Sequence, residues 1–137
     1  MDGEKKKILI IDDDNFLLDM YAFKFSQGNF EVYTAMNGVQ GIEKLKGGLT
    51  PDIILTDVIM PEMDGFEMLE KINQENLSAK SIKIVLSNKS EQADIDRGNG
   101  LGVSGYIVKA NSTPAEVITQ VMDILAKKIA MEKQINS

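Results

Sequence analysis

Short apolar runs alternate with longer amphipathic stretches along the whole chain. Four of the runs are apolar almost throughout and end directly at a polar side chain. They are 8–11, 53–56, 82–86 and 106–108. Continuous runs rich in β-branched residues are typical of strands that are covered on both faces, as in a parallel sheet. A fifth run, 30–34, alternates apolar and polar residues, which favours a strand nearer the sheet edge.

The stretches between these runs have the apolar spacing of helices. Helices are expected over 15–27, 38–46 and 65–76. The last helix has the clearest start, because Thr113-Pro114-Ala115-Glu116 combines a capping box with proline at the first helical position. The stretch 91–101 is polar and contains two glycines, so we expect either a frayed helix or a loop there.

Five strands that alternate with about five helices predict an α/β fold. The expected architecture is a doubly wound five-stranded parallel sheet with helices on both faces. A length of 137 residues has room for one domain. We place this domain at residues 1–126 and assign residues 127–137 to an extension of the last helix or to the stub of a linker.

Composition excludes several classes of function. The chain has no cysteine and no histidine, which removes disulfides, thiolate catalysis, histidine-based triads and the usual zinc ligands. A net charge of −6 argues against direct nucleic-acid binding. No stretch approaches the roughly 20 apolar residues that span a membrane, and the charged start of the chain does not resemble a signal peptide. We therefore expect a cytoplasmic protein without a membrane partner.

The polar side chains at the strand ends indicate the chemistry. In an open parallel sheet, ligands bind beyond the carboxyl ends of the strands. The residues at these ends are Asp12, Asp13, Asp14, Asp57, Ser87 and Lys109. Clustered carboxylates without histidine or cysteine favour a hard cation, Mg²⁺ before Ca²⁺ or Mn²⁺. A hydroxyl and an ammonium beside them supply donors for phosphoryl oxygens. This set predicts a phosphoryl-transfer site in which an aspartate is the acceptor.

The chain resembles a known family, the receiver domain of bacterial response regulators, over residues 6 to about 126. The segments that carry the resemblance are 8–13, 52–57, 60–65, Ser87 and 104–109. The resemblance implies a flavodoxin-like receiver fold similar to that of chemotaxis regulators. It also implies Mg²⁺-dependent phosphorylation that switches a protein–protein interaction surface.

Each matching residue takes an expected role from this resemblance. Asp57 matches the phosphorylated aspartate. Mg²⁺, or Mn²⁺ in its place, is expected at Asp13, Asp57 and the backbone carbonyl of Ile59, with Asp12 acting through water.

A second group of matches concerns the phosphoryl group and the switch. Ser87 matches the switch hydroxyl that bonds the phosphoryl group, and Lys109 matches the lysine that pairs with it. Tyr106 matches the aromatic residue whose rotamer changes with the switch, although its position also suits an ordinary half-buried aromatic side chain.

The resemblance further implies partners. The phosphoryl donor is expected to be a sensor histidine kinase or a histidine phosphotransfer protein, and the downstream target is a protein. We expect a monomer or a weak phosphorylation-dependent dimer, and no conventional enzyme activity beyond the domain's own phosphoryl transfer and hydrolysis. In helix 15–27 we expect Leu17 and Tyr21 to face the sheet. A second stripe there, made of Phe16, Met20 and Phe23, is either a broad core contact or a docking surface.

Two residues depart from the family pattern. The family usually has Lys-Pro, with a cis peptide bond, where this chain has Lys109-Ala110. A cis bond before a residue other than proline costs ~2.5–4 kcal/mol, so the bond is expected to be trans or strained. Asn88 follows the switch hydroxyl, where small residues are common, and is expected to slow donor entry and hydrolysis. These departures leave open a receiver that no longer takes phosphate.

Two other classes fit less well. The pair Asp12-x-Asp14 imitates the nucleophile motif of haloacid-dehalogenase-type phosphatases, but Phe16 stands where that family has Thr or Val, and Asp57 is left unexplained. We expect Asp14 to be only a charge in the first helical turn. A flavodoxin-like FMN carrier fits the fold but lacks a Ser/Thr-Gly phosphate loop after the first strand.

Overall fold

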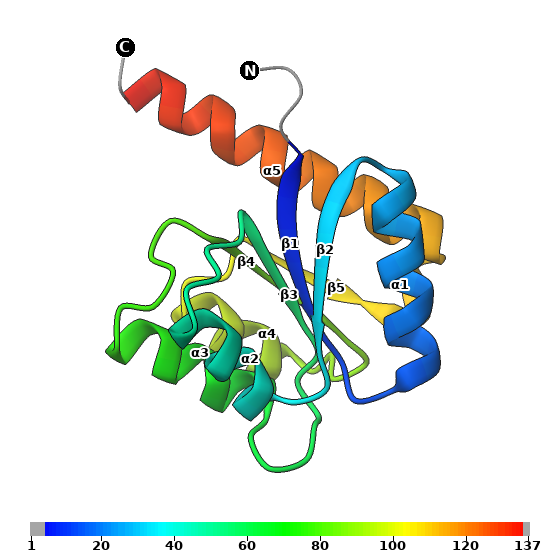
Figure 1. The fold of residues 1–137 in the computed structure, drawn as a ribbon, viewed down its shortest axis with the longest axis vertical. Coiled ribbons are helices and arrows are strands. Elements are labelled where there is room, and N and C mark those ends of the chain that lie inside the picture. Colours follow the sequence, from blue (N-terminus) through cyan, green and yellow to red (C-terminus); the bar gives the residue numbers. More distant parts are fainter. Residues whose placement is uncertain (1–4, 136–137) are drawn as a thin grey trace.

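The predicted α/β fold is confirmed by a computed structural model, which describes residues 5–135 (Figure 1). Five parallel strands form one sheet in the order β2-β1-β3-β4-β5. The elements in chain order are β1 (Lys6–Ile11), α1 (Asn15–Gln27), β2 (Phe30–Ala35), α2 (Gly38–Lys46), β3 (Ile53–Thr56), α3 (Gly65–Gln74), β4 (Ile82–Ser87), α4 (Gln92–Gly100), β5 (Gly105–Val108), the 3₁₀ turn η1 (Lys109–Asn111) and α5 (Pro114–Ile135).

The helices form two layers around the sheet. α1 and α5 cover one face, and α2, α3 and α4 lie on the other (Figure 1). Successive residues of β1 enter different cores: Ile8 and Ile10 pack with α1 and α5, whereas Leu9 and Ile11 pack on the opposite side. All four side chains are buried. Burial on both faces explains why this strand is continuously apolar.

The alternating strand lies at the edge of the sheet, as its pattern predicted. β2 pairs only with β1 among the described strands, and Glu31 is exposed on it. The other edge is β5, which is only four residues long. The expected site residues lie at or directly after the ends of β1, β3, β4 and β5.

The polar segment 91–101, expected to be either a frayed helix or a loop, forms the α-helix Gln92–Gly100 with Glu91 and Leu101 at its caps. It contacts α3, where the Arg97 guanidinium pairs with the Glu70 carboxylate at 3.0 Å and stacks over the ring of Phe66. Gly98 is buried, and an added Cβ there would lie 3.1 Å from the ring of Tyr106. The close packing of α4 against β5 thus leaves little room for a side chain at position 98.

The last helix begins where it was expected and continues beyond residue 126. The Glu116 N–H donates to Thr113 Oγ1 at 3.2 Å, and the Thr113 N–H donates to Glu116 Oε1 at 2.9 Å. The helix then continues without a break to Ile135, so residues 127–135 extend it. Residues 136–137 and 1–4 lie outside the described part. No helix within residues 5–135 has the length and apolar character needed to cross a membrane.

The faces of α1 differ in part from the expected ones. Tyr21 is buried and Leu17 packs half-buried against the same core, as predicted, and Leu18, which was not predicted to face the sheet, is buried as well. Met20 packs against the core, so it does not belong to an open stripe. The exposed apolar surface of α1 is reduced to Phe16 and Phe23, which are 77% and 60% exposed.

Candidate functional site

Two adjacent strands bring the first carboxylates together. β1 and β3 pair in parallel with Ile11 opposite Thr56, so Asp12 and Asp57 leave the sheet at the same edge. The Asp57 N–H donates to the Ile11 carbonyl at 2.9 Å, which fixes the backbone of the second aspartate beside the first. The strand register thus determines the spacing of the two side chains.

Three carboxylates form a cluster at this edge. Asp12, Asp13 and Asp57 each offer one oxygen atom, and these atoms lie within 4.8 Å of one another. Asp12 and Asp57 are 2% and 8% exposed, whereas Asp13 is open to solvent. Negative groups this close repel one another unless a cation lies among them. An all-oxygen donor set with one open side suits a hard divalent ion that keeps several waters. The cluster could therefore hold such an ion.

The fourth expected ligand is a backbone atom. Ile59 lies two residues beyond Asp57, and its side chain is 65% exposed. A backbone carbonyl can serve as a ligand whatever the side chain is, and the role of this carbonyl stays a prediction.

Lys109 follows the edge strand β5, and its side chain reaches two of the clustered carboxylates. Its Nζ donates to Asp12 Oδ2 at 2.6 Å and to Asp57 Oδ2 at 2.7 Å. The lysine side chain is only 9% exposed. Charge-assisted hydrogen bonds of this length are among the strongest in proteins. They aim the ammonium at the expected acceptor.

Burial and pairing act in opposite directions on these groups. Burial raises the pKa of Asp12, and the hydrogen bond from Lys109 offsets only part of this effect. Burial alone would lower the pKa of Lys109, but its hydrogen bonds to Asp12 and Asp57 outweigh burial, so the pKa lies above its ordinary value. The lysine therefore stays charged at neutral pH, as a partner for anionic oxygens must.

The expected switch residues lie on β4 and β5. Ser87 is fully buried, and its Oγ accepts from the Lys89 N–H at 3.2 Å. Tyr106 is half-buried, and its hydroxyl donates to the Lys89 carbonyl. Burial, with smaller effects from Asp94 and Asp57, raises the pKa of Tyr106 to about 12. Both residues are thus hydrogen-bonded to the backbone of Lys89, in the loop after β4, and not to the carboxylates.

Known proteins share this sequence pattern. A family model described as the response regulator receiver domain matches residues 8–123. The chain belongs to this family. Receiver domains act in two-component signalling, between histidine kinases and downstream effectors.

Relatives of the receiver domain include regulators of different lengths. The chemotaxis protein CheY of Thermotoga maritima is 35% identical over 105 residues, which cover 76% of this chain and 85% of that protein. The alkaline phosphatase synthesis transcriptional regulatory protein PhoP of Bacillus subtilis is 31% identical over 122 residues, or 89% of this chain and 49% of that protein. The chain thus spans about half of this relative, and smaller shares of several others.

A solved structure agrees with the fold. The signal receiver domain of the putative response regulator NarL from Mycobacterium tuberculosis superposes with a TM-score of 0.79 and 26% sequence identity. The match covers 90% of this chain and 98% of that one. The predicted receiver fold is therefore supported along nearly the whole chain.

The unusual Lys109-Ala110 bond of this receiver domain is trans, as are all peptide bonds of residues 5–135. The expectation had left a trans bond and a strained cis bond open. A short 3₁₀ turn, which the sequence did not predict, begins at Lys109. The lysine reaches both carboxylates from this trans backbone.

Asp14 is the helix cap that its position suggested. Its Oδ1 accepts from the Leu17 N–H at 3.1 Å, and the residue is exposed. It lies outside the carboxylate cluster, so the first and third aspartates of the acidic run do not share one site. This arrangement gives no support to the phosphatase interpretation.

Gly65, the last residue of the matching segment 60–65, packs against the backbone of the expected phosphoacceptor. The Gly65 N–H donates to the Val58 carbonyl at 2.8 Å, and an added Cβ at Gly65 would lie 2.1 Å from the Asp57 carbonyl oxygen. Only glycine allows such an approach. The start of α3 is thereby packed directly under Asp57.

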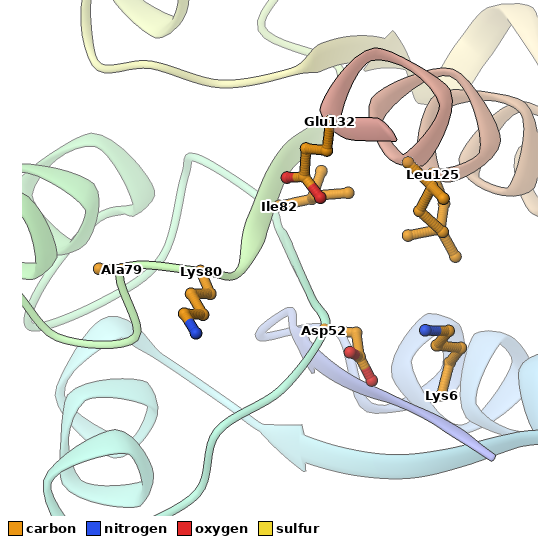
Figure 2. A pocket seen from close by; sticks show the side chains of 8 residues that line it. Lys6, Asp52, Ala79, Lys80, Ile82, Leu125 and Glu132 are labelled. Atoms are coloured by element: carbon orange, nitrogen blue, oxygen red, sulfur yellow. The ribbon is translucent and has the colours of Figure 1, made fainter. Parts of the chain in front are cut away.

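A hollow of about 540 Å³ lies at the opposite end of the sheet, below the last turns of α5 (Figure 2). Figure 2 shows Leu125 and Glu132 of α5 on one side and Lys6 and Asp52 on the other. Its lining charges are of both signs, and it shares no residue with the carboxylate cluster. It is therefore no part of the candidate site.

Proposed function

We propose that this receiver domain accepts a phosphoryl group on Asp57 and that the modification switches a protein-binding surface. The observation that carries the proposal is the position of the Asp57 carboxylate, which lies in a three-aspartate cluster and accepts from Lys109 Nζ at 2.7 Å. A nucleophilic carboxylate beside a fixed cation suits phosphoryl transfer better than it suits a structural ion pair.

The transfer is a displacement at phosphorus. An Asp57 carboxylate oxygen forms the new P–O bond, and the bond from phosphorus to the donor nitrogen or oxygen breaks, with the electron pair leaving on the donor. Lys109 neutralises charge on the phosphoryl oxygens, and the Ser87 hydroxyl is the expected donor to another of them. Bound Mg²⁺, held by Asp13, Asp57 and the Ile59 carbonyl and by Asp12 through water, would supply positive charge to the same oxygens.

The proposed partners follow from this chemistry. The donor is a sensor histidine kinase or a histidine phosphotransfer protein, and Phe16 and Phe23 on α1 are a candidate docking surface for it. The target is a protein, and neither nucleic acid nor a membrane is a direct partner. We propose a cytoplasmic monomer or weak phosphorylation-dependent dimer that is not a conventional enzyme.

The experiment is intact-protein mass spectrometry after incubation with acetyl phosphate and Mg²⁺. The wild type should gain the mass of one phosphoryl group, and Asp57→Asn should gain none. Asp14→Asn is a matched control, because asparagine keeps the helix cap and the residue lies outside the cluster. Full labelling of Asp57→Asn would contradict the proposal, and so would an unlabelled wild type.

A further inference from the structure

The two residues that depart from the family pattern are hydrogen-bonded to each other. The Ala110 N–H donates to Asn88 Oδ1 at 2.8 Å. A proline at position 110 could not make this bond, because it has no N–H. An alanine or glycine at position 88 would offer no side-chain acceptor. The bond therefore requires both departures together.

This bond lies where the sheet ends. The last residue pair between β4 and β5 is Ser87 opposite Val108. One step further, the Asn88 side chain accepts from the backbone of η1 as a neighbouring strand would. The side-chain amide thus adds one rung to the pairing of β4 with β5.

Both ends of the added rung adjoin site residues. Asn88 follows the buried hydroxyl of Ser87, and Ala110 follows Lys109, whose Nζ bonds Asp12 and Asp57. Within residues 5–135, this is the one hydrogen bond or ion pair that joins segment 88–90 to segment 109–111. Segment 88–90 is otherwise held by the bond from the Lys89 N–H to Ser87 Oγ, by Tyr106 and by the Lys89–Asp94 ion pair.

We propose that Asn88 is a positioning residue that ties the loop after Ser87 to the turn that carries Lys109. The tie keeps the two segments moving together, so that a displacement of the serine loop is passed to the lysine turn. This role rests on the proposed phosphorylation of Asp57, whereas the tie itself exists in the unmodified protein. Removing it should let the two segments respond separately.

The first test measures amide proton exchange of Ala110 by NMR in the unmodified protein. Loss of one net hydrogen bond in Asn88→Ala should speed this exchange about threefold to tenfold. Asn88→Asp keeps a carboxylate oxygen in the place of Oδ1 and should stay close to the wild type. Asn99→Ala, which removes an exposed asparagine side chain of α4, is the matched control and should leave Ala110 unchanged. Unchanged exchange of Ala110 in Asn88→Ala would overturn the proposal.

The second test measures exchange of segments 88–90 and 109–111 before and after phosphorylation by acetyl phosphate and Mg²⁺. In the wild type and in Asn88→Asp both segments should respond. In Asn88→Ala segment 88–90 should respond as in the wild type, whereas the response of 109–111 should shrink to the part that reaches it directly through the Lys109–Asp57 bond. A merely structural role would not separate the two responses in this way. An unaltered response of 109–111 in Asn88→Ala would overturn the positioning role. A wild type that takes no phosphoryl group would contradict the proposed function, and the first test would still decide the tie.

Discussion

The two sides of the candidate site are stabilised in different ways. The carboxylate side, at the ends of β1 and β3, holds buried charges through bonds of 2.6 and 2.7 Å to Lys109 and is packed against Gly65. The switch side, the loop after β4 together with α4, is held by hydrogen bonds and partly exposed ion pairs, and the buried residues of α4 are only Asp94 and Gly98. Regions with few buried contacts open and rearrange most readily. The carboxylate side is therefore built for fixed chemistry and the switch side for movement.

The largest effect is expected on the carboxylate side. Asp13→Asn removes a negative charge from the cluster and should lower Mg²⁺ affinity about tenfold to a hundredfold, by comparison with the loss of supporting residues at other metal sites. The exposed position of Asp13 should leave folding intact. The measurement is phosphorylation by acetyl phosphate as a function of Mg²⁺, with circular dichroism to check the fold. Equal labelling of the variant and the wild type in limiting Mg²⁺ would show that Asp13 is not a ligand of the metal.

A pair of glycine substitutions compares the packing of the two sides. Gly65→Ala places a Cβ 2.1 Å from the Asp57 carbonyl oxygen and should lower the free energy of unfolding by about 1–3 kcal/mol or more. Gly100→Ala has no atom within 4 Å of the added Cβ and should raise it by about 0.4–1 kcal/mol. Urea unfolding of both variants measures the difference. A neutral Gly65→Ala would mean that the backbone under Asp57 moves freely.

The next prediction concerns how phosphorylation divides between the two sides. A phosphoryl group brings about two negative charges and three acceptor oxygens. We expect the Ser87 hydroxyl to move inward and donate to one of these oxygens. Amide exchange should therefore change far more in residues 87–109 than in residues 30–46. Ser87→Ala should still be phosphorylated but should show a weaker change. If the variant and the wild type change equally, the hydroxyl does not lead the switch.

The smallest effect is a shifted titration on the switch side. The pKa of Tyr106 should lie at about 12, above its ordinary value of 10.0, because burial disfavours the phenolate. The folded protein then binds this proton more tightly than the unfolded chain. The corresponding stability is present below pH 10 and is lost as the pH rises through about 12. Ultraviolet difference titration, with Tyr106→Phe to identify the signal, checks this. A titration midpoint of Tyr106 near 10.0 would contradict the prediction and would mean that its hydroxyl is solvated.

Much of this arrangement could be predicted because it depends on strand ends. Continuous apolar runs indicated strands buried on both sides, and parallel strands place Asp12 and Asp57 at one edge whatever the loops do. α4 was uncertain because its contacts, Arg97 with α3 and Gly98 with Tyr106 of β5, are made with distant segments that the local sequence does not show. The bond between Asn88 and Ala110 was missed for the same reason, since each residue was judged alone.

The long last helix has a mechanical consequence. α5 is 22 residues long, or about 33 Å at about 1.5 Å per residue, and its cap at Thr113 follows closely after the lysine turn. The helix is packed on the sheet through Val117 and Val121, which are fully buried, and it continues to Ile135 as one rod. If this rod tilted by about 5° as one body, Ile135 would move by about 3 Å. Displacements beside Lys109 and at Ile135 are therefore linked through one helix rather than through a flexible segment.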